Sequence, residues 1–320
     1  MLYFGLSYIK NSDLLLQYIL ISAVSLGVLL LASDWFIDAA EKIGLAFGIS
    51  PFIIGVTIVA FGTSLPELAA SIACVSSGTS EIVIGNVVGS NITNILLVLG
   101  LTCMVGKSFK LDFNIWDMDM PLLLGSAFLM YFVLQDAHLS TIEAVLLLFA
   151  LVGFLINSVS GSEMGDPDSR PQIQKMDVAK LIAGGVLVYV GAIATIYGIE
   201  GLSREAGISP EIISLTFVAL GTSLPEVVVS ISAAKKGKHA IAVGNVLGSN
   251  IFNTYAVMAI PSFLGELKIP QNVLDFGLPF MVAMTIMFGA MTFSRRLSKW
   301  EGVLLLVFYV YYLAEQFGSI

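Results

Sequence analysis

Long apolar runs recur along the whole of this 320-residue chain. Each run has the roughly 17 to 25 residues that an α-helix needs to cross a bilayer. Only 12% of the residues are charged and 57% are hydrophobic, with a mean hydropathy of +0.92, so a water-soluble fold could not shield this sequence from solvent. We therefore predict an all-α polytopic membrane protein with ten transmembrane helices, near residues 14–32, 51–75, 82–104, 119–135, 141–159, 181–200, 210–234, 240–264, 273–293 and 300–317.

Two polar segments define how these spans are grouped. The segment Met1 to Asp13 is short and weakly charged, and the apolar run after it is too long for a signal-peptide core, so we predict an uncleaved first span. The stretch Ser158 to Lys180 combines Gly, Pro, Ser and charged residues, which is typical of a linker. We predict two five-helix halves, 1–157 and 181–320, joined by a linker at 158–180.

The basic residues predict the orientation in the membrane. With these spans, three of them fall on one side, namely Lys10, Arg204 and Lys268. The other twelve fall on the opposite side: Lys42, Lys107, Lys110, Arg170, Lys175, Lys180, Lys235, Lys236, Lys238, Arg295, Arg296 and Lys299. The positive-inside rule then places both termini outside the cell membrane and the linker in the cytoplasm. The net charge of −8 says little about partners, and no basic patch indicates nucleic acid.

An internal repeat relates the two halves. The hexapeptide GTSLPE occurs at 62–67 and again at 221–226, and GNVVGSNITN at 85–94 is followed by GNVLGSNIFN at 244–253, both at an offset of 159 positions. Because each half has an odd number of spans, the second half must enter the membrane from the opposite side. In such inverted repeats the substrate site forms near the midplane, at helices interrupted by Gly or Pro, and access to it alternates.

Glu67 and Glu226 are the central candidates for this site. Each lies about halfway along an apolar span, where an ionised carboxylate is costly and is a functional candidate by default. The structural alternative is a protonated glutamate that hydrogen bonds within the bundle. Four pairs of side chains share a helix face at i, i+4 spacing: Thr63 with Glu67, Ser90 with Asn94, Thr222 with Glu226 and Ser249 with Asn253. Together they would form an all-oxygen cage, which suits a hard cation.

The neighbouring residues allow both structural and functional interpretations. Pro66 and Pro225 lack an amide hydrogen, so we expect the helix to be disturbed one turn earlier, at Gly62 and Gly221, with carbonyls freed for a cation. The glycines Gly85, Gly89, Gly244 and Gly248 have the spacing of close helix packing. Structural hydrogen bonding is the favoured role of Asn86, Asn91, Asn245 and Asn250.

Charge balance suggests how such a site would work. Two carboxylates neutralise one divalent ion or two monovalent ions, whereas an empty, doubly ionised site would leave buried charge uncompensated at several kcal/mol per ion. An empty carrier should therefore resist switching sides, and this favours an exchanger over a leak.

The paired motifs GTSLPE and GNxxGSNxxN, present in both halves, resemble those of the sodium/calcium exchanger branch of the cation/calcium antiporter superfamily, in its prokaryotic form. The resemblance covers nearly the whole chain. It implies that long first and sixth helices slide across a core of the other eight, and that sodium entry drives calcium export. It implies central ligands at Glu67, Asn94, Glu226 and Asn253, and sodium sites at Ala60, Thr63, Ser64, Ser90, Ala219, Thr222, Ser223 and Ser249.

One position departs from part of the family. Some archaeal members and the potassium-dependent branch have Asp where this chain has Asn253. The change removes one negative charge, which argues against potassium co-transport and leaves the number of sodium ions per cycle open.

Other functions remain to be weighed against this one. The carrier could couple calcium, or another divalent ion such as manganese, to protons, or the acidic centre could serve a cation channel. An intramembrane hydrolase using Ser64 or Ser223 would need a nearby base, and His138 and His239 are both expected at loops. Cys74 and Cys103 lie in apolar segments and form no CxxC pair. We predict a transporter of calcium and sodium that is no enzyme and has no cofactor and no obligate protein partner.

Overall fold

The computed structural model describes residues 2–106, 109–111, 115–117, 119–160, 170–205 and 222–316. Almost all of this part of the chain is helical. Its one sheet is a short antiparallel pair, β1 (Phe109–Lys110) with β2 (Arg296–Leu297). This pair ties a loop of the first half to a loop of the second.

The first half consists of one long helix followed by shorter ones. Its elements are α1 (Leu2–Ala46), α2 (Pro51–Ile54), η1 (Gly55–Val59), α3 (Ala60–Ser76), α4 (Glu81–Thr93), η2 (Asn94–Val98), α5 (Leu99–Val105), α6 (Asp119–Val133) and α7 (Thr141–Ser160). Two π-helical turns, η1 and η2, interrupt the shorter helices.

The elements of the second half also begin with a long helix. Within the described residues these are α8 (Lys175–Glu205), α10 (Leu224–Lys235), α11 (His239–Phe252), η4 (Asn253–Val257), α12 (Met258–Ser262), η5 (Val273–Gly277), α13 (Leu278–Thr292) and α14 (Lys299–Gln316).

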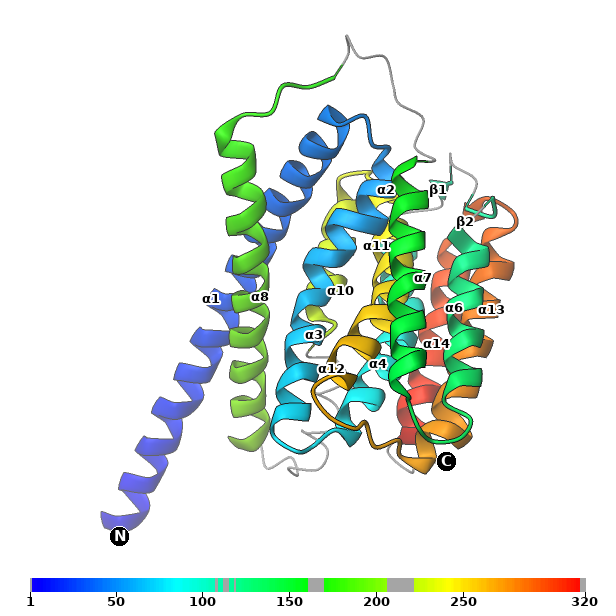
Figure 1. Ribbon diagram of the computed structural model, residues 1–320. Coiled ribbons are helices and arrows are strands. Elements are labelled where there is room, and N and C mark those ends of the chain that lie inside the picture. The colour runs from blue at the N-terminus through cyan, green and yellow to red at the C-terminus, as the bar shows by residue number, and fades with distance from the viewer. Residues whose placement is uncertain are drawn as a thin grey trace.

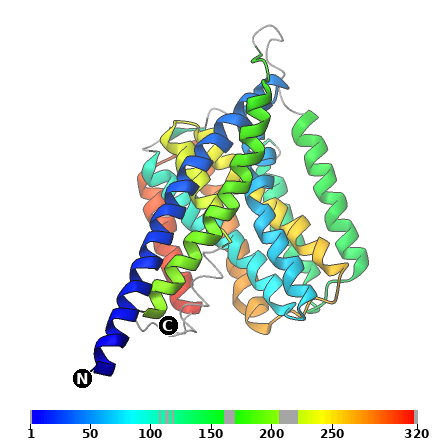
Figure 2. The same cartoon turned by 90° about the vertical axis from the view of Figure 1, so that its left-hand side faces the viewer.

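The two long helices, α1 and α8, lie side by side and run in opposite directions along one flank of a bundle formed by the other helices (Figures 1 and 2). Three glycines of α8 spaced seven apart, Gly184, Gly191 and Gly198, meet Phe36, Leu29 and Ser22 of α1. Thr195 donates a hydrogen bond to Ser25 at 2.9 Å across the same contact. Small residues and a buried hydroxyl bond hold helices together in a bilayer, so α1 and α8 form a tightly joined pair.

Within the bundle, α11 crosses the first half at very short range. A Cβ atom added to Gly248 would lie 2.1 Å from the Val56 carbonyl oxygen, and one added to Gly244 would lie 2.5 Å from that of Phe52. These two glycines therefore have the packing role expected of them. The close approach holds α11 against the segment that leads into α3.

Six helices of the described residues are long and apolar enough to cross a membrane. They are Leu14–Ala46, Pro51–Ser76, Glu81–Val105, Thr141–Ser158, Lys175–Leu202 and Val273–Thr292. The count of ten spans stays a prediction. In the predicted span 210–234, the part before Thr222 lies outside the described residues.

Helix boundaries differ from the sequence prediction at two places. The first helix starts at Leu2, well before the predicted span at 14–32, and helices enter both ends of the predicted 158–180 linker, since α7 ends at Ser160 and α8 begins at Lys175. Hydropathy marks only the part of a helix that is apolar, and polar turns extend these helices beyond it.

The expected break at Gly62 is wrong, whereas Gly221 lies outside the described residues. The helix α3 runs unbroken through Gly62 and Pro66, and the irregular backbone is the π-helical turn at Gly55–Val59. The missing amide hydrogen of a proline removes one hydrogen bond, and a packed helix can continue past that loss.

We predict that Gly248→Ala destabilises the fold, because the new methyl group meets a backbone carbonyl that cannot rotate away. The expected loss is about 2 to 3 kcal/mol, the usual cost of overpacking a core. It should appear as a lower melting temperature in detergent. Gly125→Ala is the control, because its added Cβ has nothing within 4 Å on the exposed side of α6. Equal melting temperatures for the two variants would contradict the packing argument.

Candidate cation site

Glu67 and Glu226 are buried within the bundle, and each directly follows a GTSLP sequence. Glu67 is on α3 and Glu226 is in the first turn of α10, and both side chains are 0% exposed. The Ser64 hydroxyl of α3 donates a hydrogen bond to Glu226 Oε1 at 3.2 Å, so the two halves meet here.

Asn94 and Asn253 occupy matching positions at the start of the π-helical turns η2 and η4. Both side chains are 0% exposed. A π-helical turn is rare and frequently marks a functional site. Nothing in the periodicity of the sequence predicts these turns.

Most polar atoms of these four side chains have no hydrogen-bond partner among the described residues. This holds for both oxygens of Glu67, for Oε2 of Glu226 and for the amide groups of Asn94 and Asn253. Buried polar groups are nearly always paired, because an unpaired one loses its hydration without compensation. Carboxylate and amide oxygens together are the donor set of a hard cation such as calcium or sodium, so these residues fit such an ion.

Three contacts bring predicted hydroxyl ligands of the two halves together. Besides the Ser64 bond, Thr63 Oγ1 lies 3.4 Å from Ser249 Oγ, and Ser90 Oγ lies 3.4 Å from Thr222 Oγ1. The last two contacts are related by the repeat, because each partner maps onto the other at the offset of 159. Ala60 and Ser223 are buried on the same segments, whereas Ala219 lies outside the described residues.

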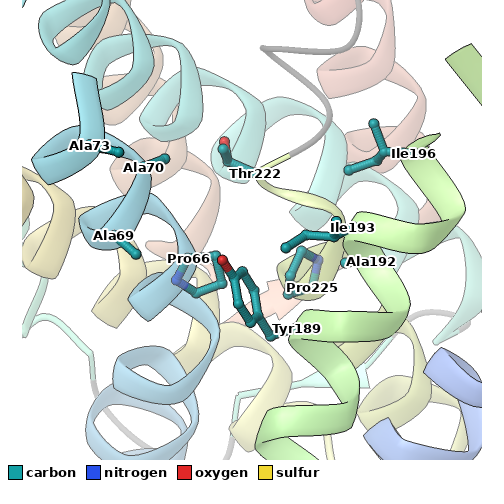
Figure 3. A pocket seen from close by; sticks show the side chains of 10 residues that line it. All are labelled: Pro66, Ala69, Ala70, Ala73, Tyr189, Ala192, Ile193, Ile196, Thr222 and Pro225. Carbon is teal, nitrogen blue, oxygen red and sulfur yellow. The ribbon is translucent and has the colours of Figure 1, made fainter. Parts of the chain in front are cut away.

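A cavity of about 320 Å³ reaches the site from one side. Figure 3 shows Pro66 and Pro225, which precede the two glutamates, facing Tyr189 of α8 across it. It continues along the C-terminal parts of α3 and α8, toward the end of the molecule where α1 begins. Its lining is Pro66, Ala69, Ala70, Ala73, Tyr189, Ala192, Ile193, Ile196, Thr222 and Pro225.

Two serines near the site were not singled out from the sequence. Ser71 and Ser230 are buried and accept hydrogen bonds from Asn86 and Asn245. Each lies four residues after a glutamate, on the same helix face, and that spacing was a signal in the sequence.

The histidines and cysteines lie outside this constellation. His239 stacks on Phe109 with ring centroids 4.3 Å apart, and His138 is in the loop before α7. Cys74 and Cys103 are free. Within the described ranges no three His, Cys, Asp or Glu side chains gather as a metal cluster, so any cation here must also use amide and hydroxyl oxygens.

Comparison with protein families gives one match. The profile of the family described as sodium/calcium exchanger protein matches residues 17–159 and 177–318. These two ranges fall on either side of the predicted linker.

Similar proteins cover nearly all of the chain. The sodium/calcium exchanger MaX1 of Methanosarcina acetivorans is 34% identical over 344 residues, covering 93% of this chain and 98% of MaX1. The putative antiporter CaxA of Alkalimonas amylolytica is 32% identical over 311 residues, covering 92% of this chain and 97% of CaxA. A solved structure of the sodium-calcium exchanger NCX_Mj, soaked with sodium and strontium, superposes with a TM-score of 0.83 at 29% identity, covering 94% of this chain and 99% of that one.

We predict that Glu67→Gln changes thermal stability in opposite ways with and without calcium. In a chelator the variant should melt a few degrees higher than the original protein, because one buried charge is removed. Added calcium should raise the melting temperature of the original protein and leave that of the variant nearly unchanged. The exposed Glu266 provides the control, and Glu266→Gln should behave like the original protein in both conditions. A calcium response that survives Glu67→Gln would contradict the assignment of this site.

Proposed function

The chain belongs to the sodium/calcium exchanger protein family, and on this premise we propose that it is a secondary antiporter that exchanges sodium for calcium across the cell membrane. Sodium entering down its gradient drives calcium out through one site that is exposed alternately to the two sides. Calcium and sodium are the transported substrates, with no cofactor and no protein partner needed for the exchange. In the proposed orientation both termini are outside and the segment around 158–180 is cytoplasmic.

The observation that carries this proposal is the set of unpaired polar atoms on Glu67, Glu226, Asn94 and Asn253. Such a set is unstable in a membrane interior unless a cation completes it. We propose these four as the central ligands. The flanking sodium sites would use Ala60, Thr63, Ser64 and Ser90 with Ala219, Thr222, Ser223 and Ser249.

Charge supplies the coupling. Two carboxylates balance one calcium ion or two sodium ions, and Asn94 and Asn253 add ligands without adding charge. A site without its ions carries two buried negative charges that repel each other, at a cost of several kcal/mol per ion. Only the loaded carrier then changes sides at a useful rate, which makes transport an exchange.

The cavity breaks the symmetry of the repeat, and this supports alternating access. In the repeat, the cavity residues Ala73 and Ala192 correspond to Ser232 and Ser33. These serines are 7% and 0% exposed and hydrogen bond to each other at 3.0 Å. Where Ala73 and Ala192 line a cavity, the equivalent residues Ser232 and Ser33 are in direct contact.

A cluster of charges lies beyond the Ser33 to Ser232 contact and closes the same end. Lys236, between α10 and α11, pairs with Asp34 at 3.2 Å and with Asp38 at 2.9 Å. Lys238 pairs with Asp38 and, at 2.8 Å, with Glu41. Each exposed pair contributes little alone, but a network of four spans from α1 to the bundle. Opening this end would require these pairs to separate.

We predict that vesicles loaded with sodium take up calcium when diluted into sodium-free buffer. Glu67→Gln or Glu226→Gln should lower the rate by about a hundredfold or more, because each removes a charge whose loss costs several kcal/mol. Glu266→Gln should transport normally. Uptake that ignores the sodium gradient or survives both substitutions would refute the proposal. Uptake driven by a pH jump without sodium would indicate proton coupling, and single-channel currents would indicate a channel.

We also predict unequal labelling of cysteines placed at one equivalent pair of positions. In a background lacking Cys74 and Cys103, Ala73→Cys should react with a membrane-impermeant thiol reagent, since Ala73 is exposed and lines the cavity. Ser232→Cys, at the equivalent position of the other half, should react far more slowly in the same state because Ser232 is buried against Ser33. Equal rates at the two positions would contradict this asymmetry of access.

A further inference from the structure

Two asparagines outside the proposed ligand set hold the two threonines of the site. Thr63 Oγ1 donates to Asn245 Oδ1 at 3.1 Å, and Thr222 Oγ1 donates to Asn86 Oδ1 at 3.1 Å. Each bond joins one half of the molecule to the other, and the two bonds are equivalent under the repeat. Each threonine lies four residues before a glutamate, and Thr63 shares the α3 face of Glu67.

The orientation of each amide is fixed from its far side. Asn245 Nδ2 donates to Ser230 Oγ at 2.9 Å, and Asn86 Nδ2 donates to Ser71 Oγ at 3.4 Å. When the NH₂ group of an asparagine donates to the serine, its carbonyl oxygen points in the opposite direction, toward the threonine. Each threonine therefore meets an acceptor.

This orientation decides what the threonine hydroxyl presents to a cation. A hydroxyl has one hydrogen and two lone pairs, and a cation ligand must present a lone pair. The shortest acceptor for Thr63 is Asn245, since the Ala60 carbonyl oxygen is 3.3 Å away and Ser249 Oγ is 3.4 Å away. This geometry directs the hydroxyl hydrogen to Asn245.

Without Asn245, the hydroxyl hydrogen of Thr63 would turn to a different acceptor. The Glu226 carboxylate is a second acceptor within hydrogen-bonding reach of the Thr63 hydroxyl. A hydroxyl that turns to this carboxylate would occupy an oxygen lone pair that the cation needs, and it would point its own hydrogen into the site. Bulk water cannot reach the Thr63 hydroxyl to act as the acceptor instead, because Thr63 is 1% exposed and Asn245 is 0% exposed.

We propose that Asn245 and Asn86 are positioning residues that set cation affinity by taking the hydroxyl hydrogens of Thr63 and Thr222. They touch no ion themselves. The role rests on the proposed cation site, and it assigns these asparagines a function in binding in addition to helix packing.

The test is a double-mutant cycle on calcium binding, measured as the calcium dependence of the melting temperature of the full-length protein in detergent. Asn245→Leu removes the acceptor at similar volume and should weaken apparent calcium affinity about tenfold, the range of one buried hydrogen bond. In a Thr63→Val background, where no hydroxyl remains to be oriented, the same substitution should change affinity by less than about twofold. Sodium titrations should show the same non-additivity.

Two further variants control for damage to the fold. Ser230→Ala keeps Asn245 and frees only its amide, so it should weaken calcium binding by a smaller factor that also disappears with Thr63→Val. If Asn245→Leu does not fold, the double-mutant cycle is measured with Ser230→Ala in its place. Asn91 is a buried amide on α4 that donates to Thr254 at 2.9 Å, so Asn91→Leu removes a comparable cross-helix bond. Its effect on calcium affinity should be the same with Thr63 and with Val at position 63.

The outcomes separate this role from the site itself. If Asn245→Leu and Ser230→Ala weaken binding equally in both backgrounds, or not at all, the positioning role is overturned while the cation site stands. If neither calcium nor sodium stabilises the original protein, the cation site fails and the positioning role fails with it.

Discussion

The burial of two carboxylates in the apolar centre of a membrane protein is the constraint on which the rest of the structure depends. Glu67 and Glu226 are fully buried, and among the described residues the Ser64 and Thr63 hydroxyls lie within reach of Glu226 as side-chain donors. Charge in that position is stable only with a counter-charge. The acidic helices of the two halves meet at Glu226 and Ser64, and the unpaired oxygens around them are what the proposed cation would complete.

The two halves are symmetric in their hydrogen bonds at the candidate site but not in the cavity beside it. The hydrogen bonds of Thr63 and Thr222 are equivalent in partners and length, as expected if both halves contribute alike to one site. Access breaks this symmetry, because a cavity lined by Ala73 and Ala192 exists where the other half has a closed serine pair. A carrier needs both properties, since an unchanged site must be reached by two routes that are never open together.

The long helix pair is suited to such a change. The contact of α8 glycines with α1 holds the two helices together, while ion pairs and a serine contact join α1 to the bundle at one end. The helix α1 also buries Phe36 and Ile37 in an apolar cluster with Ile54 and Val229 of the bundle, and apolar contacts have no fixed direction. A tightly packed pair that rests on an apolar surface can slide along it as a unit, which is the motion that alternating access requires.

The sequence by itself determined that the chain is a membrane protein and which family it belongs to, because hydropathy and identical motifs survive without coordinates, and it predicted two acidic residues as central. It marked helix positions well but not their ends, since polar turns extend α1 and α8 beyond the apolar core. Only the tertiary structure decided that Pro66 leaves α3 unbroken, that π-helical turns begin at Asn94 and Asn253, and that Asn245 and Asn86 accept hydrogen bonds from the threonines. These features depend on which atoms of the two halves meet, and contacts across a fold leave no periodic signal along the chain.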